Sequence, residues 1–205
     1  MMARRTKQDA MATREAIMDA AAVLFEQQGV SGTTLQHIAT AAGVTRGAIY
    51  WHFEDKGALF TAMMERAKMP METAMRVLDA EDTDDPLRDL RDCMLEALRL
   101  TATDEQMRRV FDIATRKLEM VGEMSEMRER LLQSHRRWME RAESRIRIGI
   151  RRKQVKPDVS PTVTALGLWA SMDGLIRIWL VDQAAFDLQQ AGRQIFDTQL
   201  DCLRA

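Results

Sequence analysis

The sequence predicts an all-α protein, and three observations support this. The 205 residues contain only four prolines and ten glycines, and β-branched residues rarely occur in runs. Little in the chain therefore breaks a helix or favours a strand. Apolar residues recur at intervals of three and four along most of the sequence, which is the period of an amphipathic helix. Hydrophobic residues make up 46% and charged residues 30%, which is typical of a soluble globular protein.

The first two helices are predicted from their start and stop signals. Residues 13–28 carry apolar side chains at helical spacing, and Gly29 is a natural left-handed stop. A second helix begins at the Thr33–Thr34 pair, where Thr33 and Gln36 resemble a capping box. It ends at Gly43, where glycine supplies a left-handed turn residue.

A short third helix and a long fourth helix follow. The third ends near Trp51, and Asp55 caps the fourth. Pro70 falls inside the fourth helix. Because proline lacks an N–H and its ring clashes with the carbonyl of Arg66, we expect an interruption and a kink near Met69.

Further helices are predicted at about residues 86–101, 104–120, 125–152, 161–182 and 187–203. The helix at 161–182 is apolar nearly all round, so it must be covered on every side. We expect its own domain to cover one side and a second subunit the other. Residues 128–153 carry ten basic and three acidic side chains. They predict a solvated helical face, with a second anion-binding surface as the alternative.

Charge and cysteine content limit the classes of protein. The net charge is −1, and residues 1–60 hold six basic and six acidic side chains. A nucleic-acid interface would therefore depend on where single charges lie. Two cysteines are too few for a disulfide framework. No apolar stretch reaches the roughly 18 residues that span a bilayer. The N-terminus does not have the pattern of a signal peptide. We expect a cytoplasmic protein.

The segment TTLQHIATAAGVTRGAIYWHF has the spacing of a helix-turn-helix, two helices joined by a short turn that contains glycine. Thr45 caps the second helix and Arg46 points outward, where it can bond the O6 and N7 atoms of guanine. Small side chains at positions 47 and 48 allow close approach to bases. The predicted DNA-binding residues are Thr33, Thr34, Thr45, Arg46, Gly47, Ala48, Tyr50, Trp51, His52 and Lys56.

Each of these residues has a simpler alternative. Tyr50 and Trp51 could be core aromatics, and Thr34 could be only a helix cap. Lys56 could be a solvated surface lysine rather than a phosphate contact at a helix N-terminus.

Extended to TTLQHIATAAGVTRGAIYWHFEDKGALF, the segment resembles the TetR family of bacterial regulators, and closely its AcrR-like branch of multidrug-efflux repressors. Weaker local agreement lies at residues 117–124, 173–179 and 186–188. The resemblance implies about nine helices in a homodimer that associates through its two C-terminal helices. It also implies a DNA-binding head at residues 1–56, with a basic arm at 1–12, and a ligand-binding and dimerisation body at 57–205.

By this resemblance, Arg46 reads bases, while Thr34, Tyr50, His52 and Lys56 hold the DNA backbone. Two residues depart from the family pattern. Gly57 follows Lys56 where a helix former is more usual, which weakens the first turn by about 1 kcal/mol. Pro70 falls in the helix that the family uses to link its two domains.

The body is rich in methionine, which suits either a helical core or a pocket for varied apolar ligands. The positions that match the pocket of efflux repressors are Cys93, Met94, Ala97, Phe111, Thr115, Trp138, Trp169, Met172, Asp173 and Arg177. Asp173 and Arg177 are four residues apart in an apolar helix. They could satisfy each other, or Asp173 could be the polar group that binds a ligand amine or hydroxyl.

The sequence thus predicts a repressor that binds a pseudo-palindromic DNA operator and is released by a lipophilic, drug-like inducer. An alternative is a TetR-type regulator that responds to an acyl or other metabolite. A third is an all-helical enzyme or scaffold with a fortuitous helix-turn-helix. The three histidines show no metal-ligand spacing, and the sequence contains no catalytic motif. We therefore expect that the protein binds no metal or cofactor and is not an enzyme.

Overall fold

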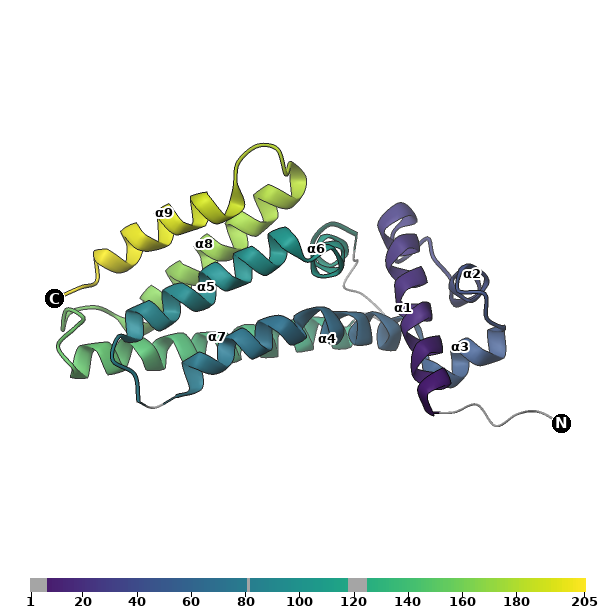
Figure 1. Cartoon of the computed structure of the whole chain (residues 1–205), viewed down its shortest axis with the longest axis horizontal. Helices are drawn as coiled ribbons and strands as arrows, with labels where there is room; N and C mark the ends of the chain where they lie inside the picture. Colours follow the sequence, from purple (N-terminus) through teal and green to yellow (C-terminus); the bar gives the residue numbers. More distant parts are fainter. Residues whose placement is uncertain (1–6, 81, 118–124) are drawn as a thin grey trace. The chain divides into compact units, whose positions relative to one another are not determined.

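The computed structural model describes residues 7–80, 82–117 and 125–205, and these residues confirm the all-α prediction (Figure 1). The only β-type pairing among them is an isolated bridge between Val155 and Arg204. The helices are α1 (Lys7–Gln28), α2 (Leu35–Ala41), α3 (Arg46–His52), α4 (Lys56–Met75), the 3₁₀ turn η1 (Arg76–Asp79), α5 (Pro86–Thr103), α6 (Glu105–Asp112), the π-helical η2 (Ile113–Lys117), α7 (Ser125–Arg151), α8 (Pro161–Val181) and α9 (Leu188–Asp201).

The helix ends follow mostly from local signals. Gly29 and Gly43 adopt φ angles of 76° and 66°, so both are the left-handed stops that the sequence predicts. Helix α1 begins at Lys7, six residues before the predicted start. Its first turns are mostly exposed, with Met11 at 60% exposure. These turns carry no apolar stripe, and the predicted start depends on that stripe.

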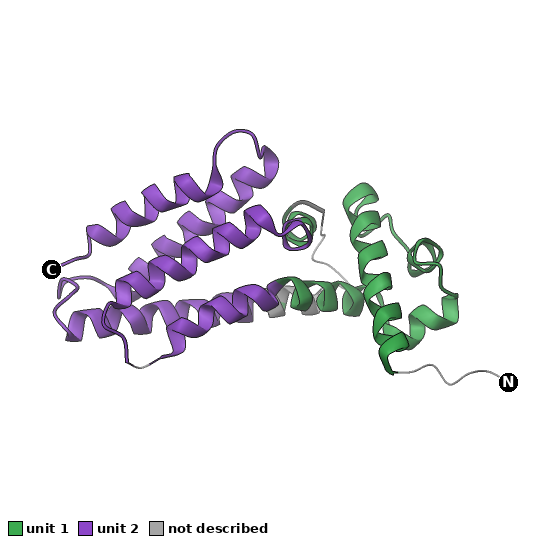
Figure 2. Cartoon of the chain, in the orientation of Figure 1, with its two compact units in different colours: residues 1–67, 109–130 green, residues 68–108, 131–205 purple. Residues whose placement is uncertain are grey.

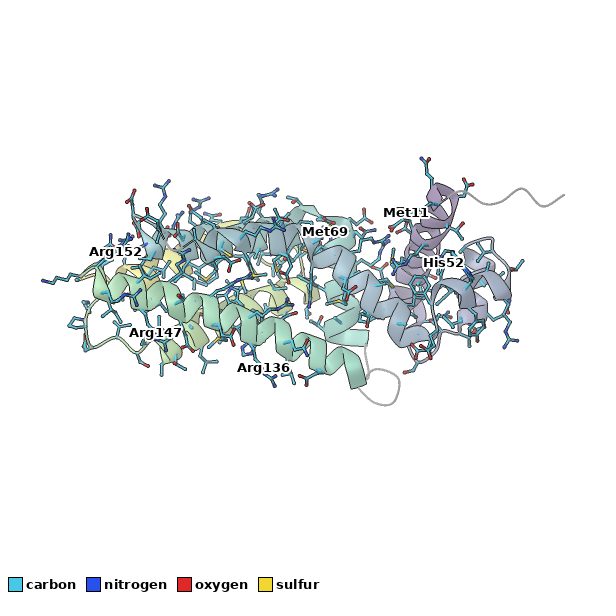
Figure 3. All side chains as sticks on the ribbon, turned by 90° about the horizontal axis from the view of Figure 1, so that it is seen from below. Met11, His52, Met69, Arg136, Arg147 and Arg152 are labelled. Atoms are coloured by element: carbon cyan, nitrogen blue, oxygen red, sulfur yellow. The ribbon has the colours of Figure 1, made fainter. Side chains whose placement is uncertain are left out.

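The predicted interruption at Pro70 is wrong, because α4 runs as one helix from Lys56 to Met75. Proline removes only one hydrogen bond, the one that the carbonyl of Arg66 would accept. Met69 and Pro70 are both exposed (Met69 is labelled in Figure 3), so water can reach the carbonyl that lacks a partner.

The chain divides into two compact units, residues 1–67 with 109–130 and residues 68–108 with 131–205 (Figure 2). Helix α4 contributes to both. The division therefore does not coincide with the expected boundary after residue 56. The physical reason is that Leu59, Phe60 and Met63, in the first turns of α4, are fully buried in the core of the first unit.

The first unit is built around α1. The rings of Phe25 on α1 and Phe60 on α4 meet edge to face at 6.1 Å between centroids. Arg66 on α4 bonds two carboxylates of α1, those of Glu15 and Asp19. On α6, Arg109 lies 2.9 Å from Glu26 of α1.

In the second unit, α5 packs against α9 and α8 (Figure 1). Arg91 of α5 bonds Asp197 of α9 through two nitrogens, and this hydrogen bonding holds the pKa of Asp197 below its ordinary value. Gly192 of α9 lies against Leu98 of α5. A Cβ at position 192 would lie only 2.0 Å from Leu98 Cδ1, so the buried Leu98 side chain would have to move to admit any larger residue.

The prediction that residues 128–153 form a solvated basic face is wrong in part. Arg136 and Arg147 are exposed along α7 (Figure 3). Arg145, on the same helix, is fully buried at 0% exposure. Arg141 bonds Asp79 with two nitrogens at 2.6 and 2.8 Å. One face of this helix is therefore a structural contact rather than a solvated surface.

Helix α8 has one covered and one uncovered side. Ala165, Leu168 and Met172 are buried within the second unit. Among the large apolar side chains, those exposed on α8 are Val163, Leu166, Ile178 and Val181, at 52 to 69% exposure. By length and composition α8 is also the one described helix that could cross a membrane, although core helices of soluble proteins have the same character. The expectation that no segment is long and apolar enough was therefore too strict.

The packing of α5 on α9 leads to a prediction. Gly192→Ala forces a methyl group against Leu98, so it should destabilise the protein by about 1–3 kcal/mol, as overpacking does in other cores. Thermal unfolding followed by circular dichroism measures the change. Gly47→Ala is the matched control, because a Cβ at Gly47 meets nothing within 4 Å. Equal unfolding temperatures for the two variants would contradict this account.

Candidate nucleic-acid interface

Two threonine caps and a glycine turn build the helix-turn-helix. Thr34 Oγ1 accepts the backbone N–H of His37 at 3.1 Å, and Thr45 Oγ1 accepts that of Ala48 at 3.2 Å. The turn between them closes through the N–H of Val44, which donates to a carbonyl of α2 at 2.9 Å. Each cap uses a lone pair of its hydroxyl, so the hydroxyl proton can still be donated to a phosphate oxygen.

The predictions that Thr33 caps the second helix and that it contacts DNA are both wrong. Its side chain is fully buried, and its Oγ1 donates to the carbonyl of Gly29 at 2.7 Å. The cap of α2 is Thr34, so no capping box forms with Gln36. Thr33 therefore closes the turn between α1 and α2 and is not available to DNA.

The exposed side of α3 carries most of the predicted contacts. Arg46 and Gly47 are exposed, and Tyr50 and Trp51 are 49% and 73% exposed. Ile49 alone among the residues of α3 is buried and anchors the helix to the core. The alternative that Tyr50 and Trp51 are core aromatics is therefore wrong.

Arg46 lies beside the ring of Tyr50, one helical turn away. Its Cζ atom is 5.7 Å from the ring centroid, within the range of a cation–π contact. Within the described part of the chain, Arg46 forms no ion pair. The guanidinium is thus oriented by an aromatic face and keeps its hydrogen-bond donors for a base.

His52 is half-buried at the end of α3, where its ring lies 4.6 Å from that of Trp51 and 6.3 Å from that of Phe53 (Figure 3). Gln36 and His37 are exposed in the first turn of α2, beside Thr34. Both are further candidates for DNA contacts that the sequence pattern alone did not indicate. Their place directly after a helix cap was the available signal, because first-turn side chains lie beside the helix N-terminus.

Lys56 is half-buried, and its Nζ donates to the carbonyl of Val30 at 3.1 Å. It is therefore more than a solvated lysine, and two of its three N–H groups remain for a phosphate. Asp55 Oδ1 already accepts the N–H of Ala58 at 2.7 Å, at the N-terminus of α4. That carboxylate offsets the helix dipole, so any attraction for phosphate comes from the Lys56 ammonium rather than from the dipole.

The basic arm expected at residues 1–12 is only partly described. Arg4 and Arg5 lie outside the described residues. Lys7 is the first residue of α1, so residues 7–12 are helical.

The candidate ligand residues fall into both compact units. Phe111 and Thr115 lie on α6 and η2, in the first unit. The other eight lie in the second unit: Cys93, Met94, Ala97, Trp138, Trp169, Met172, Asp173 and Arg177. The structure therefore does not place all ten in one compact unit.

Helices α7 and α8 bring aromatic rings together in the second unit. The ring of Trp169 lies 5.2 Å from that of Trp138 and 4.8 Å from that of His135, which the sequence analysis did not select. On α5, burial raises the pKa of the Cys93 thiol to about 12. Cys93 is therefore neutral at physiological pH and behaves as an apolar side chain.

Asp173 and Arg177 form an ion pair with each other. Arg177 Nε bonds Asp173 Oδ2 at 2.6 Å. The side chain of Arg177 is 54% exposed and that of Asp173 is 40% exposed. The geometry favours the alternative in which the pair satisfies itself, because the carboxylate already has a partner and is open to water.

The positions of Arg46 and Lys56 lead to a prediction for operator binding. Arg46→Ala should cost about 1–3 kcal/mol and relax base preference, because it removes a base reader. Lys56→Ala should weaken all DNA similarly and lower the salt slope by about one. Fluorescence anisotropy on matched and scrambled duplexes at several salt concentrations separates the two effects. Unchanged discrimination in Arg46→Ala would contradict the base-reading role.

The contact between Arg46 and Tyr50 allows two roles of Tyr50 to be separated. Tyr50→Phe keeps the ring but removes the hydroxyl, so it should retain base preference and lose only a phosphate contact. Tyr50→Leu removes the ring as well, so it should also relax preference at the base that Arg46 reads. The expected effect is about 0.5–1 kcal/mol, the usual size of an exposed cation–π contact. If both variants discriminate bases equally well, Tyr50 does not orient Arg46.

Comparisons with known proteins agree with this geometry. Residues 17–63 match the family of bacterial regulatory proteins of the tetR type, and residues 85–205 match the C-terminal region of MAATS-type transcriptional repressors. The HTH-type transcriptional regulator AcrR of Shigella flexneri is 38% identical over 192 residues, which cover 94% of this chain and 89% of AcrR.

Two solved structures are similar along nearly the whole chain. NalD, described as the secondary repressor of the MexAB-OprM multidrug efflux pump in Pseudomonas aeruginosa, is 35% identical with a TM-score of 0.87, covering 97% of this chain and 98% of NalD. SmeT in complex with triclosan is 31% identical with a TM-score of 0.82, covering 95% of this chain and 92% of SmeT. The chain therefore belongs to the TetR family of bacterial transcriptional regulators.

Proposed function

We propose that the protein is a ligand-responsive repressor that binds a pseudo-palindromic operator as a homodimer, controls a multidrug efflux pump, and is released by lipophilic inducers. One observation carries the proposal. A helix-turn-helix with exposed Arg46 and Tyr50 is joined to a body that is similar over nearly its whole length to efflux-pump repressors. The protein would act in the cytoplasm, where its DNA lies.

Binding of DNA would depend on a few placed groups. Helix α3 would enter the major groove, with Arg46 bonding a guanine and the capping hydroxyls of Thr34 and Thr45 donating to phosphates. The first 60 residues carry as many acidic as basic side chains, six of each. Non-specific attraction by a single head would therefore be weak, and two heads on one operator would be needed for useful affinity.

The uncovered side of α8 supports a dimer. Val163 and Leu166 near one end of the helix, and Ile178 and Val181 near the other, are large apolar side chains open to water. Several large apolar side chains exposed on one helix are typical of a surface that binds another protein chain. A second copy of the same helix, related by a twofold axis, would cover it with a self-complementary surface.

The second unit offers apolar and aromatic side chains suited to a lipophilic ligand. Trp138 and Trp169 are in ring contact, and Met94, Met172 and the neutral thiol of Cys93 are buried on α5 and α8 of the same unit. Aromatic and methionine side chains accept ligands of varied shape because dispersion contacts need little directional fit. A ligand would release DNA only as far as it binds the released conformation more tightly.

A gel-shift experiment tests the function. The protein should shift DNA from upstream of its own gene, and triclosan should reverse the shift while a fatty acyl thioester should not. Reversal by the thioester alone would support the metabolic alternative. No shift at low salt would overturn the proposal. Trp169→Leu is the useful variant, because it should lose the triclosan response while binding DNA normally.

The dimer has its own test. Leu166→Glu places a charge on the uncovered face of α8, so it should yield a folded monomer that no longer shifts DNA. Met11→Glu is the matched control, since it places the same charge at a similarly exposed apolar side chain, 60% against 52%, that lies on α1 (Figure 3). Light scattering after size exclusion gives the molar mass. A dimeric Leu166→Glu protein would rule out this face as the interface.

A further inference from the structure

Arg145 of α7 is the largest fully buried side chain in the described part of the protein. A buried guanidinium is costly unless all of its surroundings compensate the charge. The DNA-binding and ligand-binding roles above do not use this residue. Its contacts therefore need an explanation of their own.

The partners of Arg145 are mainly the carbonyl oxygens that follow α4. Nη2 donates to the carbonyls of Val77 at 2.7 Å and Ala80 at 2.5 Å, and Nε donates to that of Leu78 at 3.3 Å. Its remaining nitrogen, Nη1, lies 3.2 Å from a carboxylate oxygen of Asp89 on α5. One planar side chain thus joins α7, the turn after α4 and the first turns of α5.

These carbonyls are the ones that a helix end leaves unpaired. Helix α4 ends at Met75 and continues as the 3₁₀ turn η1 (Arg76–Asp79). The last carbonyls of a helix lack partners within it and carry the negative end of its dipole. A cation with several donors in one plane matches such a group, and arginine is the side chain that has them.

Weaker contacts flank Arg145 along the same face of α7. Lys68 Nζ bonds Ser134 at 3.3 Å, Arg137 lies 3.5 Å from Glu72, and Arg141 pairs with Asp79. The last two pairs have one or both side chains substantially exposed, and exposed pairs add little stability. Arg145 is the buried member of the row, and its carbonyl partners lie in and directly after the 3₁₀ turn η1 that continues α4.

We propose that Arg145 is a positioning residue for DNA binding, because it fixes the C-terminal end of the helix on which the DNA-binding head is built. The proposal rests on the proposed function, in that two heads must match two half-sites. Helix α4 is continuous from Lys56 to Met75, and its first turns form part of the head core. Loosening its far end therefore loosens the placement of the whole head while leaving the helix-turn-helix itself intact.

Hydrogen exchange in the full-length protein without DNA tests the local part of the proposal. Arg145→Met keeps the length of the side chain but removes every donor, so amides of residues 69–80 should exchange at least tenfold faster. Amides of α2 and α3 should be unchanged. Arg147→Met is the matched control, because Arg147 is an exposed arginine of the same helix that pairs with Glu143, one turn away. It should behave as the wild type.

Arg145→Lys is a second variant, which keeps the test informative if Arg145→Met does not fold. It keeps the charge but has fewer donors and no planar fork, so its exchange over residues 69–80 should lie between those of wild type and Arg145→Met. Unchanged exchange in residues 69–80, or an equal increase throughout α5, α8 and α9, would overturn the proposal. The second result would mean that Arg145 only stabilises the body.

Binding to two DNA probes tests the functional part. One duplex is the sequence that the wild type protects upstream of its own gene, and the other has one half-site scrambled. Arg145→Met should bind the scrambled duplex with the affinity of the wild type. Its preference for the intact duplex, the ratio of the two affinities, should be about tenfold smaller. An unchanged preference would overturn the positioning role. A wild type without any preference would instead refute the dimeric operator, while the exchange measurement would still decide whether Arg145 holds the end of α4.

Discussion

Helix α4 belongs to both compact units, and this constraint shapes the rest of the protein. Its first turns place Leu59, Phe60 and Met63 in the core of the DNA-binding unit, and its last turns bond α7 in the second unit. An α-helix is held by a continuous ladder of hydrogen bonds, so its two ends cannot be placed independently.

The two halves of α4 are held by interactions of different kinds. On the head side, Arg66 bonds carboxylates of α1 that are themselves about half exposed. Such pairs are worth roughly 0–1 kcal/mol each. On the body side, Arg145 is buried and bonds the carbonyls of Val77, Leu78 and Ala80, which follow α4, and removing a buried charged partner typically costs about 3–5 kcal/mol. Pro70 removes one backbone hydrogen bond between these two places.

The DNA-binding head reaches its function without a basic surface. Its acidic and basic side chains are equal in number, and Asp55 even occupies the N-terminus of α4. Specific groups replace bulk charge: two capping hydroxyls, the Lys56 ammonium, and an Arg46 guanidinium held beside Tyr50. In the function proposed above, such a head would discriminate bases better than it attracts phosphate, and the spacing of two heads would control binding.

Features that depend on local chemistry can be predicted from the amino-acid sequence alone. Glycine at positions 29 and 43 and threonine at position 45 encode the turns and the cap, because these depend on residues a few positions apart. Only the tertiary structure decided burial. It placed Thr33 inside and Tyr50 outside, and it buried Arg145 within an arginine-rich helix that had seemed wholly solvated. The partners of Arg145 come from distant segments, the turn after α4 and the start of α5. Helical periodicity does not predict which distant segments will cover a given residue.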